Sequence, residues 1–234
     1  MNVLAFDTCL AAVSVAVRWR SAQGDWLSCD RLEARAGGHA ERLMPMIAEA
    51  MREAGLAFSD LERIAVTIGP GTFTGVRVGV AAARGLALAS GLAVVGATSI
   101  AVMAHGADQL LRPRAEELLA VAVDARRGMV YVQLFADRQY ATGQPMLLAP
   151  EQVGPLLGGR PIIAVGSGAA AVAGAVVAGG GKAQARLADL QPHALSLALL
   201  AGDLAPISPL RPLYLRPPDV KPQAYKSLSR APPP

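Results

Sequence analysis

The fold is decided by one stretch of the chain, Ile64-Ala-Val-Thr-Ile-Gly-Pro-Gly-Thr-Phe-Thr-Gly-Val-Arg-Val-Gly-Val-Ala-Ala-Ala-Arg-Gly-Leu-Ala-Leu88. An apolar, β-branched run ends at Gly69-Pro70-Gly71, and a helical pattern begins at Thr72. The stretch therefore predicts a strand, a tight glycine turn and a helix. Free backbone N–H groups and the positive end of a helix dipole meet at such a junction, which suits an anion.

A stripe of small residues runs along the predicted helix. Gly71, Gly75, Gly79, Ala83 and Ala87 are four residues apart, so they share one face. Another backbone can approach this face closely, because the face carries almost no side chains. The stretch can therefore serve an anion, a partner helix or both.

The glycine turn does not match the known phosphate-binding patterns. It lacks the lysine of the Walker A pattern, and Thr74 stands at the third glycine position of Gly-x-Gly-x-x-Gly. The spacing alone thus favours a structural turn over nucleotide binding.

An internal repeat divides the chain into halves. Leu4-Ala-Phe-Asp7, a turn and an alternating run over 12–17 recur as Leu118–Asp124, a turn and an alternating run over 129–135. Pro161–Val165 with Gly166-Ser-Gly168 forms a further strand and glycine turn. Such a repeat predicts an α/β protein of two similar lobes.

The expected domains are an N-terminal lobe over 1–104, a smaller C-terminal lobe over 105–215 and a Pro-rich basic tail over 216–234. In the first lobe we expect a third strand at 26–31 and a helix at 39–54, closed by Gly55 and either kinked at Pro45 or starting later. Segments 141–160 and 176–192 are expected to be loops flanking short helices.

Composition indicates a packed globular protein, with 53% hydrophobic and 17% charged residues. The net charge of +4 arises entirely beyond residue 210, from one acid, Asp219, and five basic residues, Arg211, Arg216, Lys221, Lys226 and Arg230. We therefore expect a solubilising tail, with a weak RNA or partner contact as the alternative. The N-terminus does not resemble a signal peptide, and no apolar run is long enough to span a membrane, so a cytoplasmic location is expected.

Few residues are candidates for chemistry. His39, His105 and His193 have no helical pairing, and Cys9 and Cys29 have no Cys-x-x-Cys partner, so no metal site is expected. Acidic residues at strand ends hold Mg²⁺ in two-lobed phosphotransferases, although such a residue can also cap its own turn. The candidate nucleotide site comprises Asp7, Thr8, Gly69, Gly71, Asp124, Gly166 and Gly168.

The helix predicted at 39–54 favours a partner surface. Its apolar positions, among them Leu43, Met44, Ile47 and Met51, exceed those of one buried stripe, and methionines form an adaptable surface. Together with the small-residue face of the helix at 72–88, it can present a helical surface to another subunit.

The 69–88 stretch resembles the signature of the TsaB (YeaZ) family. Four further segments, in chain order, are similar to other parts of that family: Leu4-Ala-Phe-Asp-Thr8, His39-Ala-Glu-Arg-Leu-Met-Pro-Met46, Val123-Asp-Ala-Arg-Arg-Gly-Met-Val-Tyr131 and Leu213-Tyr-Leu-Arg216. The resemblance implies an actin-like fold of the Hsp70 and sugar-kinase type (ASKHA), with two α/β lobes of mixed sheets. It also implies a paralogue, TsaD, whose two metal-binding histidines fall here at Ser99 and Met103.

The resemblance further implies a subunit without catalytic residues in bacterial tRNA threonylcarbamoyladenosine synthesis. Its partners would be a TsaD-type catalytic subunit and a TsaE-type ATPase, with a homodimer when alone and tRNA reached only through the complex. No cofactor would be required, weak ATP or ADP binding stays open, and the nucleotide site would be a vestige. The expected interface is Leu43, Met44, Ile47, Met51, Phe73, Val76, Arg77, Val80 and Arg84, to be tested with Met51→Glu plus Val80→Glu. The alternative is a small actin-like phosphotransferase or ATPase using Asp7 and Asp124.

Overall fold

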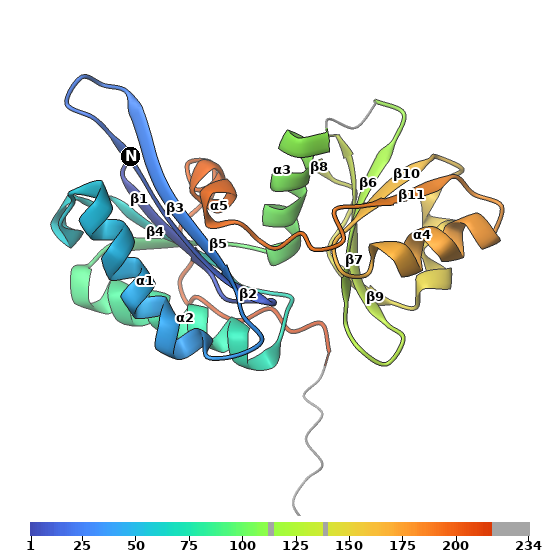
Figure 1. The fold of residues 1–234 in the computed structure, drawn as a ribbon, viewed down its shortest axis with the longest axis horizontal. Helices are drawn as coiled ribbons and strands as arrows, with labels where there is room; N and C mark the ends of the chain where they lie inside the picture. Colours follow the sequence, from blue (N-terminus) through green and yellow to red (C-terminus); the bar gives the residue numbers. More distant parts are fainter. Residues whose placement is uncertain (112–114, 138–139, 217–234) are drawn as a thin grey trace, which may run out of the picture.

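The computed structural model describes residues 1–111, 115–137 and 140–216, which form two lobes, each built on its own sheet (Figure 1). The first sheet has the order β3-β2-β1-β4-β5. Its strands are β1 (Val3–Asp7), β2 (Ala12–Arg20), β3 (Trp26–Ala34), β4 (Arg63–Thr67) and β5 (Ala93–Ala97). The central strand β1 pairs antiparallel with β2 and parallel with β4.

The second sheet repeats this arrangement in the order β11-β10-β6-β7-β8, with β9 paired to β7. Its strands are β6 (Leu118–Asp124), β7 (Val130–Asp137), β8 (Tyr140–Ala141), β9 (Met146–Leu148), β10 (Ile162–Val165) and β11 (Ala183–Arg186). Like β1, β6 pairs antiparallel with the next strand, β7, and parallel with a later one, β10. The repeat expected from the sequence is therefore a structural repeat.

Helices cover both sheets. On the first sheet, α1 (His39–Ala54) and α2 (Phe73–Ser90) lie on one face and α5 (Ala194–Leu200) on the other, whereas α4 (Ala169–Ala178) packs on the second sheet (Figure 1). Between the lobes lies α3 (Ser99–Leu111). Short 3₁₀ turns occupy Phe58–Asp60, Pro150–Gln152 and Gly154–Leu157.

The main hydrophobic core passes from one lobe to the other. It contains Phe6 of β1, Ile47 of α1, Met103 of α3 and Val121 of β6, all buried. Because α3 contributes to the core of both sheets, the lobes are packed onto a shared helix.

The helix at 39–54 is confirmed: it starts at His39, continues through Pro45 and ends at Gly55, whose φ of 66° suits glycine. The expectation of loops at 141–160 and 176–192 is wrong for β9 and β11. The strand β11, Ala-Gln-Ala-Arg, lies at the sheet edge and is mostly exposed, so its four residues include no large apolar side chain that would mark a strand.

The boundary between residues 104 and 105 falls within α3, and we keep it as a proposal. The tail beyond residue 216 lies outside the described residues. In the described ranges, no helix is both long and apolar enough to cross a membrane.

Candidate functional site: the cleft between the lobes

The small-residue stripe of α2 faces the turn between β1 and β2 of the same chain. A Cβ on Gly71 would lie 2.3 Å from the Cys9 carbonyl oxygen, and a Cβ on Gly75 would lie 2.1 Å from that of Thr8. A Cβ on Gly79 would lie 2.7 Å from Thr8 Oγ1. The expectation that this stripe receives a partner helix is therefore wrong, because the chain's own turn occupies it.

Asp7 lies beneath that turn and is fully buried. Its Oδ1 accepts hydrogen bonds from Thr67 Oγ1 and, at 3.2 Å, from the Cys9 N–H, while Oδ2 has no hydrogen-bond partner among the described residues. Burial raises the pKa of Asp7 to about 6, and the hydrogen bonds from Thr67 and Cys9 oppose the rise. Asp7 is therefore buried beneath the turn and does not line either cavity of the cleft.

Asp124, at the equivalent strand end of the second lobe, is exposed and lines the cleft between the lobes. Its Oδ1 accepts a hydrogen bond from the Arg126 N–H at 2.8 Å. The two aspartates that the sequence makes equivalent thus have different environments, and only Asp124 lines the cleft.

The cleft consists of two cavities that share Leu10, Thr72, Val123, Asp124 and Arg126 in their walls. The smaller, of about 390 Å³, lies between the start of α2, the turn after β6 and residues 213–216. The larger, of about 750 Å³, lies between the starts of α1 and α2, Asp124 and Ser167, with Arg35 and Arg126 in its wall. Of the candidate nucleotide residues, Gly71 and Asp124 line these cavities, and the others are packed beneath them.

The second-lobe glycine turn is packed as tightly as the first. A Cβ on Gly166, whose φ is +90°, would lie 2.6 Å from the Ala122 carbonyl oxygen, and a Cβ on Gly168 would lie 2.9 Å from a methyl group of Val130. Gly69, with a φ of +105°, similarly faces the Leu213 carbonyl oxygen, 2.7 Å from where a Cβ would stand. These glycines are required for close packing.

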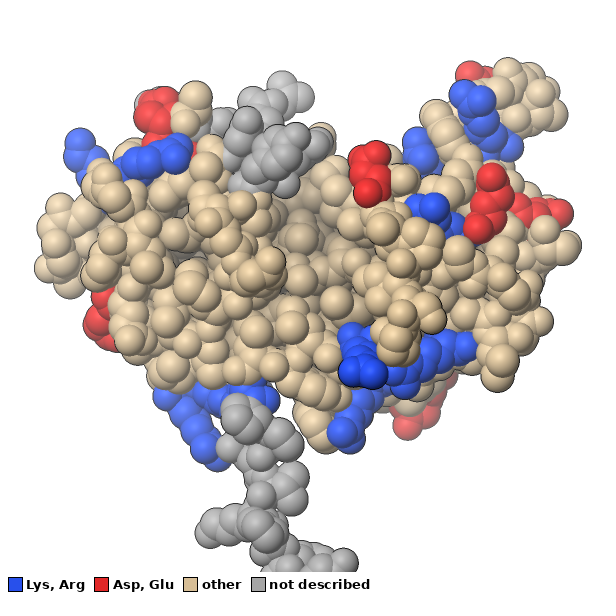
Figure 2. Space-filling model, turned by 180° about the vertical axis from the view of Figure 1, so that it is seen from behind, with Lys and Arg blue, Asp and Glu red and all other residues tan. Residues whose placement is uncertain are grey.

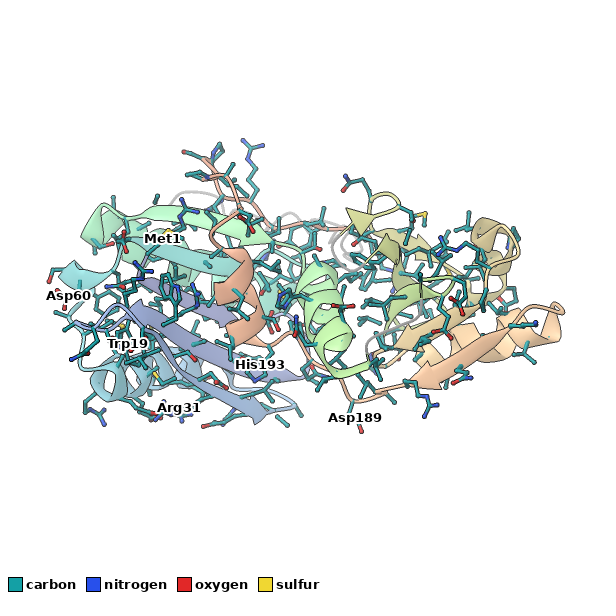
Figure 3. All side chains as sticks on the ribbon, turned by 90° about the horizontal axis from the view of Figure 1, so that it is seen from above. Met1, Trp19, Arg31, Asp60, Asp189 and His193 are labelled. Atoms are coloured by element: carbon teal, nitrogen blue, oxygen red, sulfur yellow. The ribbon has the colours of Figure 1, made fainter. Side chains whose placement is uncertain are left out.

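Nucleotide phosphates depend on free backbone N–H groups at such turns. Four of these groups are bonded within the chain: Cys9 to Asp7, Ala11 to Gln191, Arg126 to Asp124 and Gly168 to Ala122. Gln191 lies on the segment that crosses from β11 to α5, on which Figure 3 labels Asp189 and His193. These four N–H groups are therefore not free for a nucleotide phosphate.

A C-terminal strap, residues 210–216, runs along α2 and reaches the second lobe. The Leu213 N–H donates to the Ile68 carbonyl at 2.7 Å, and the Arg84 guanidinium donates to the Leu210 carbonyl. At the far end, Arg216 donates to the carbonyl of Ala125 at 2.8 Å. Sequence reasoning assigned the strap no role, although Leu213-Tyr-Leu-Arg216 had stood out as a motif.

The structure divides the expected interface residues into three groups. Five are buried in the core and cannot contact a partner, which corrects the expectation: Leu43, Ile47, Met51, Val76 and Val80. Met44 is 47% exposed on α1. The remaining three, Phe73, Arg77 and Arg84, contact the strap.

The positions that correspond to the paralogue's metal histidines are also buried. Ser99 Oγ donates to the Pro70 carbonyl, and Met103 is packed in the core. His39 lies elsewhere, with Nε2 3.0 Å from the Leu10 carbonyl oxygen. Within the described ranges, no three His, Cys, Asp or Glu side chains cluster as a metal site would require.

Two lobes that repeat one strand order around a cleft define an actin-like fold of the Hsp70 and sugar-kinase type. A family model described as "TsaD: tRNA N6-adenosine threonylcarbamoyltransferase" matches residues 33–152. YeaZ from Pseudomonas aeruginosa has 33% identity and a TM-score of 0.73, over 92% of this chain and 99% of that one. The chain belongs to the TsaB/YeaZ family.

Two further relatives show how far the similarity extends. The "tRNA threonylcarbamoyladenosine biosynthesis protein TsaB" of Escherichia coli is 35% identical over 133 residues, 56% of this chain and 53% of the relative. The match thus spans about half the length of that curated relative. An uncharacterized protein of Mycobacterium tuberculosis is 33% identical over 224 residues, 95% of both chains.

Proposed function

We propose that the chain is a non-catalytic dimerisation and activating subunit of the bacterial complex that makes threonylcarbamoyladenosine in tRNA. The names of the TsaB relatives and the description of the matching family model support the reaction. In this proposal, a TsaD-type subunit performs the transfer, and a TsaE-type ATPase binds the pair. The work takes place in the cytoplasm.

One observation carries the non-catalytic role: four backbone N–H groups of the turns that would hold phosphates are bonded within the chain. The glycine stripe brings α2 onto the turn between β1 and β2, and the carboxylate of Asp7 is buried below it. A phosphotransferase using Asp7 and Asp124 needs both carboxylates at its metal ion, and only Asp124 lines the cleft. No observation favours that alternative.

The partner surface that we propose is the exposed face of α1 and α2. Met44 is exposed on α1, and Ala81 and Leu88 are exposed on α2, with Leu88 89% exposed. The two helices lie side by side (Figure 1). The exposed alanines Ala48 of α1 and Ala81 of α2, which lie outside the stripe that faces the turn, allow a further helix to approach. The same face would form a homodimer when the catalytic subunit is missing.

Co-purification with a TsaD-type subunit tests the proposal. Met51→Glu and Val80→Glu are unsuitable, because both side chains are in the core and a buried charge would unfold the lobe. We expect Met44→Glu plus Ala81→Glu to abolish co-purification while circular dichroism and melting temperature stay at parental values. The control, Ala170→Glu plus Val177→Glu, changes exposed positions of α4 and should co-purify normally.

Two results would contradict the proposal. One is unchanged co-purification of the α1–α2 variant. The other is ATP turnover by the isolated chain that is lost in Asp124→Ala, because turnover would make the cleft an active site.

A further inference from the structure

Arginines gather along the C-terminal strap and the elements that it touches. Figure 2 shows Lys and Arg side chains along the lower edge of the molecule, on both sides of the point where the described chain ends. We call the following set the arginine surface: Arg77 and Arg84 of α2, Arg126 and Arg127 of the turn after β6, and Arg211 and Arg216 of the strap. The strap joins them, since Arg77 donates to Tyr214, Arg84 to Leu210 and Arg216 to the turn carbonyls.

The segments that form this surface carry no acidic residue of their own, although Glu41 and Asp124 share the wall of the larger cavity with Arg126. The sequence has no Asp or Glu over 63–107, 125–136 or 204–216, the ranges that contain α2, the turn and the strap. Asp124 borders the surface, and one of its oxygens is bonded to the Arg126 N–H. The three segments therefore contribute positive charge without acidic residues within them.

Two exposed aromatic rings lie within the arginine surface. Phe73 is 43% exposed and Tyr214 40% exposed, and their ring centroids are 5.4 Å apart. The guanidinium of Arg77 lies 3.6 Å from the centroid of the Phe73 ring. Both rings line the cavity of about 390 Å³, together with Arg126 and Arg216. Exposed rings among arginines are how proteins stack unpaired bases and neutralise the adjoining phosphates.

The hydrogen bonds to the strap use only some of the N–H donors of these arginines. Each guanidinium has five N–H donors. In the described part of the chain, the strap takes Nε of Arg77, and Nε and Nη2 of Arg84. The charge is retained in every case, so these side chains can still pair with phosphate oxygens.

We propose that the arginine surface binds single-stranded RNA, with arginines on the phosphates and an unpaired base stacked on Phe73 or Tyr214. The inference rests on the proposed function, in which the substrate is a tRNA. It revises the expectation that this chain reaches tRNA only through its partners. The chain contributes affinity and orientation and takes no part in the chemistry.

The test is fluorescence anisotropy of a labelled tRNA with the full-length chain, alone and with the catalytic subunit, between 50 and 200 mM salt. The test variant is Arg126→Glu plus Arg211→Glu. Both positions are exposed, and among the described residues Arg126 is bonded to the strap through its backbone carbonyl, which accepts from Arg216 and is kept in the variant. The control, Arg20→Glu plus Arg186→Glu, makes the same charge change on the β2–β3 hairpin and on β11, away from the strap (Figure 1). A second variant replaces Lys221, Lys226 and Arg230 by Gln.

We expect the test variant to bind tRNA at least roughly tenfold more weakly than the control, with a salt slope lower by about 2. Tyr214→Ala should weaken binding of a single-stranded loop more than that of a duplex, with little change in salt slope. Three results overturn the inference: equal binding by test and control variants, loss confined to the tail variant, or loss of co-purification with the catalytic subunit while tRNA binding persists. The last would make the surface a site for an acidic protein. Failure of the proposed function is distinct, because the parental chain would then not co-purify at all.

Discussion

Replacing Gly75 by alanine tests whether α2 is packed on the turn between β1 and β2. The new Cβ would lie 2.1 Å from the Thr8 carbonyl oxygen, whereas real Cβ contacts start near 3.0 Å, so α2 must move by roughly 1 Å. The turn cannot retreat, because it ends the central strand of the sheet. The movement would also strain the 2.7 Å hydrogen bond from Thr8 Oγ1 to the Gly75 carbonyl.

The magnitude follows from three opposing contributions. Overpacking costs about 1–3 kcal/mol, loss of the buried hydrogen bond costs about 1 kcal/mol, and alanine gains about 1 kcal/mol in helix propensity. We therefore expect Gly75→Ala to lower the free energy of unfolding by about 2 kcal/mol. Gly85 lies on the same helix, is exposed and would have no atom within 4 Å of a Cβ, so Gly85→Ala should raise it by up to about 1 kcal/mol.

Thermal unfolding followed by circular dichroism measures the difference. For a chain of this size, Gly75→Ala should lower the melting temperature by about 4–8 °C and Gly85→Ala should raise it by about 2–4 °C. Equal stabilisation by both substitutions would refute the packing of α2 on the turn. The small-residue face of α2 would then again be a candidate surface for a partner.

Three other predictions concern buried groups of the first lobe. Since folding raises the pKa of Asp7 from 3.8 to about 6, its protonated form stabilises the fold at pH 4 and this stability is lost as the pH rises through 6. In urea titrations, the stability of the parent relative to Asp7→Asn should thus fall by about 1.4 kcal/mol between pH 5 and pH 8; a constant difference would contradict the burial. Leu43→Ala should cost about 2–5 kcal/mol in the same assay and Met44→Ala less than about 0.5 kcal/mol, because neighbouring positions of α1 are buried and exposed, respectively. Cys9 and Cys29 are both buried, and burial raises the pKa of each thiol, so neither should react with a thiol reagent until the protein unfolds; rapid labelling of the native chain would count against this packing.

The repeat of strand, aspartate, turn and strand could be predicted because it depends on local patterns. The apolar runs ending at Asp7 and Asp124 have the period of buried strands, and the structure pairs them as the central strands β1 and β6. The end of α1 could also be predicted, since Gly55, in a left-handed conformation, closes that helix. The closing glycine of α2, Gly91, was not predicted, and that helix continues two residues beyond the expected end at 88. Short, exposed edge strands such as β11 carry no such pattern.

The environment of each site residue could not be predicted, because it depends on what packs against the residue from distant parts of the chain. The apolar pattern of α1 is equally consistent with a partner surface and with a core. In the structure, the first sheet buries Leu43, Ile47 and Met51. Asp7 and Asp124 both follow an apolar strand and precede a turn. Thr67, from a strand some sixty residues away, nevertheless donates a hydrogen bond to Asp7 and not to Asp124. Periodicity shows that a face is apolar and does not show what covers it.

The two halves of the molecule now suggest why an actin-like fold can serve as a scaffold. A kinase of this type must keep the turns of both lobes open to phosphates, and open turns carry unpaired N–H groups that cost stability until a ligand binds. In this chain, Asp7, Gln191 and Asp124 satisfy N–H groups of those turns, and glycines allow α2 to close over one of them. These bonds offset part of the cost that such turns carry when no ligand is bound. The outer face of α1 and α2 and the arginine surface along the strap are exposed, and on the proposed function they are where the chain interacts with other macromolecules.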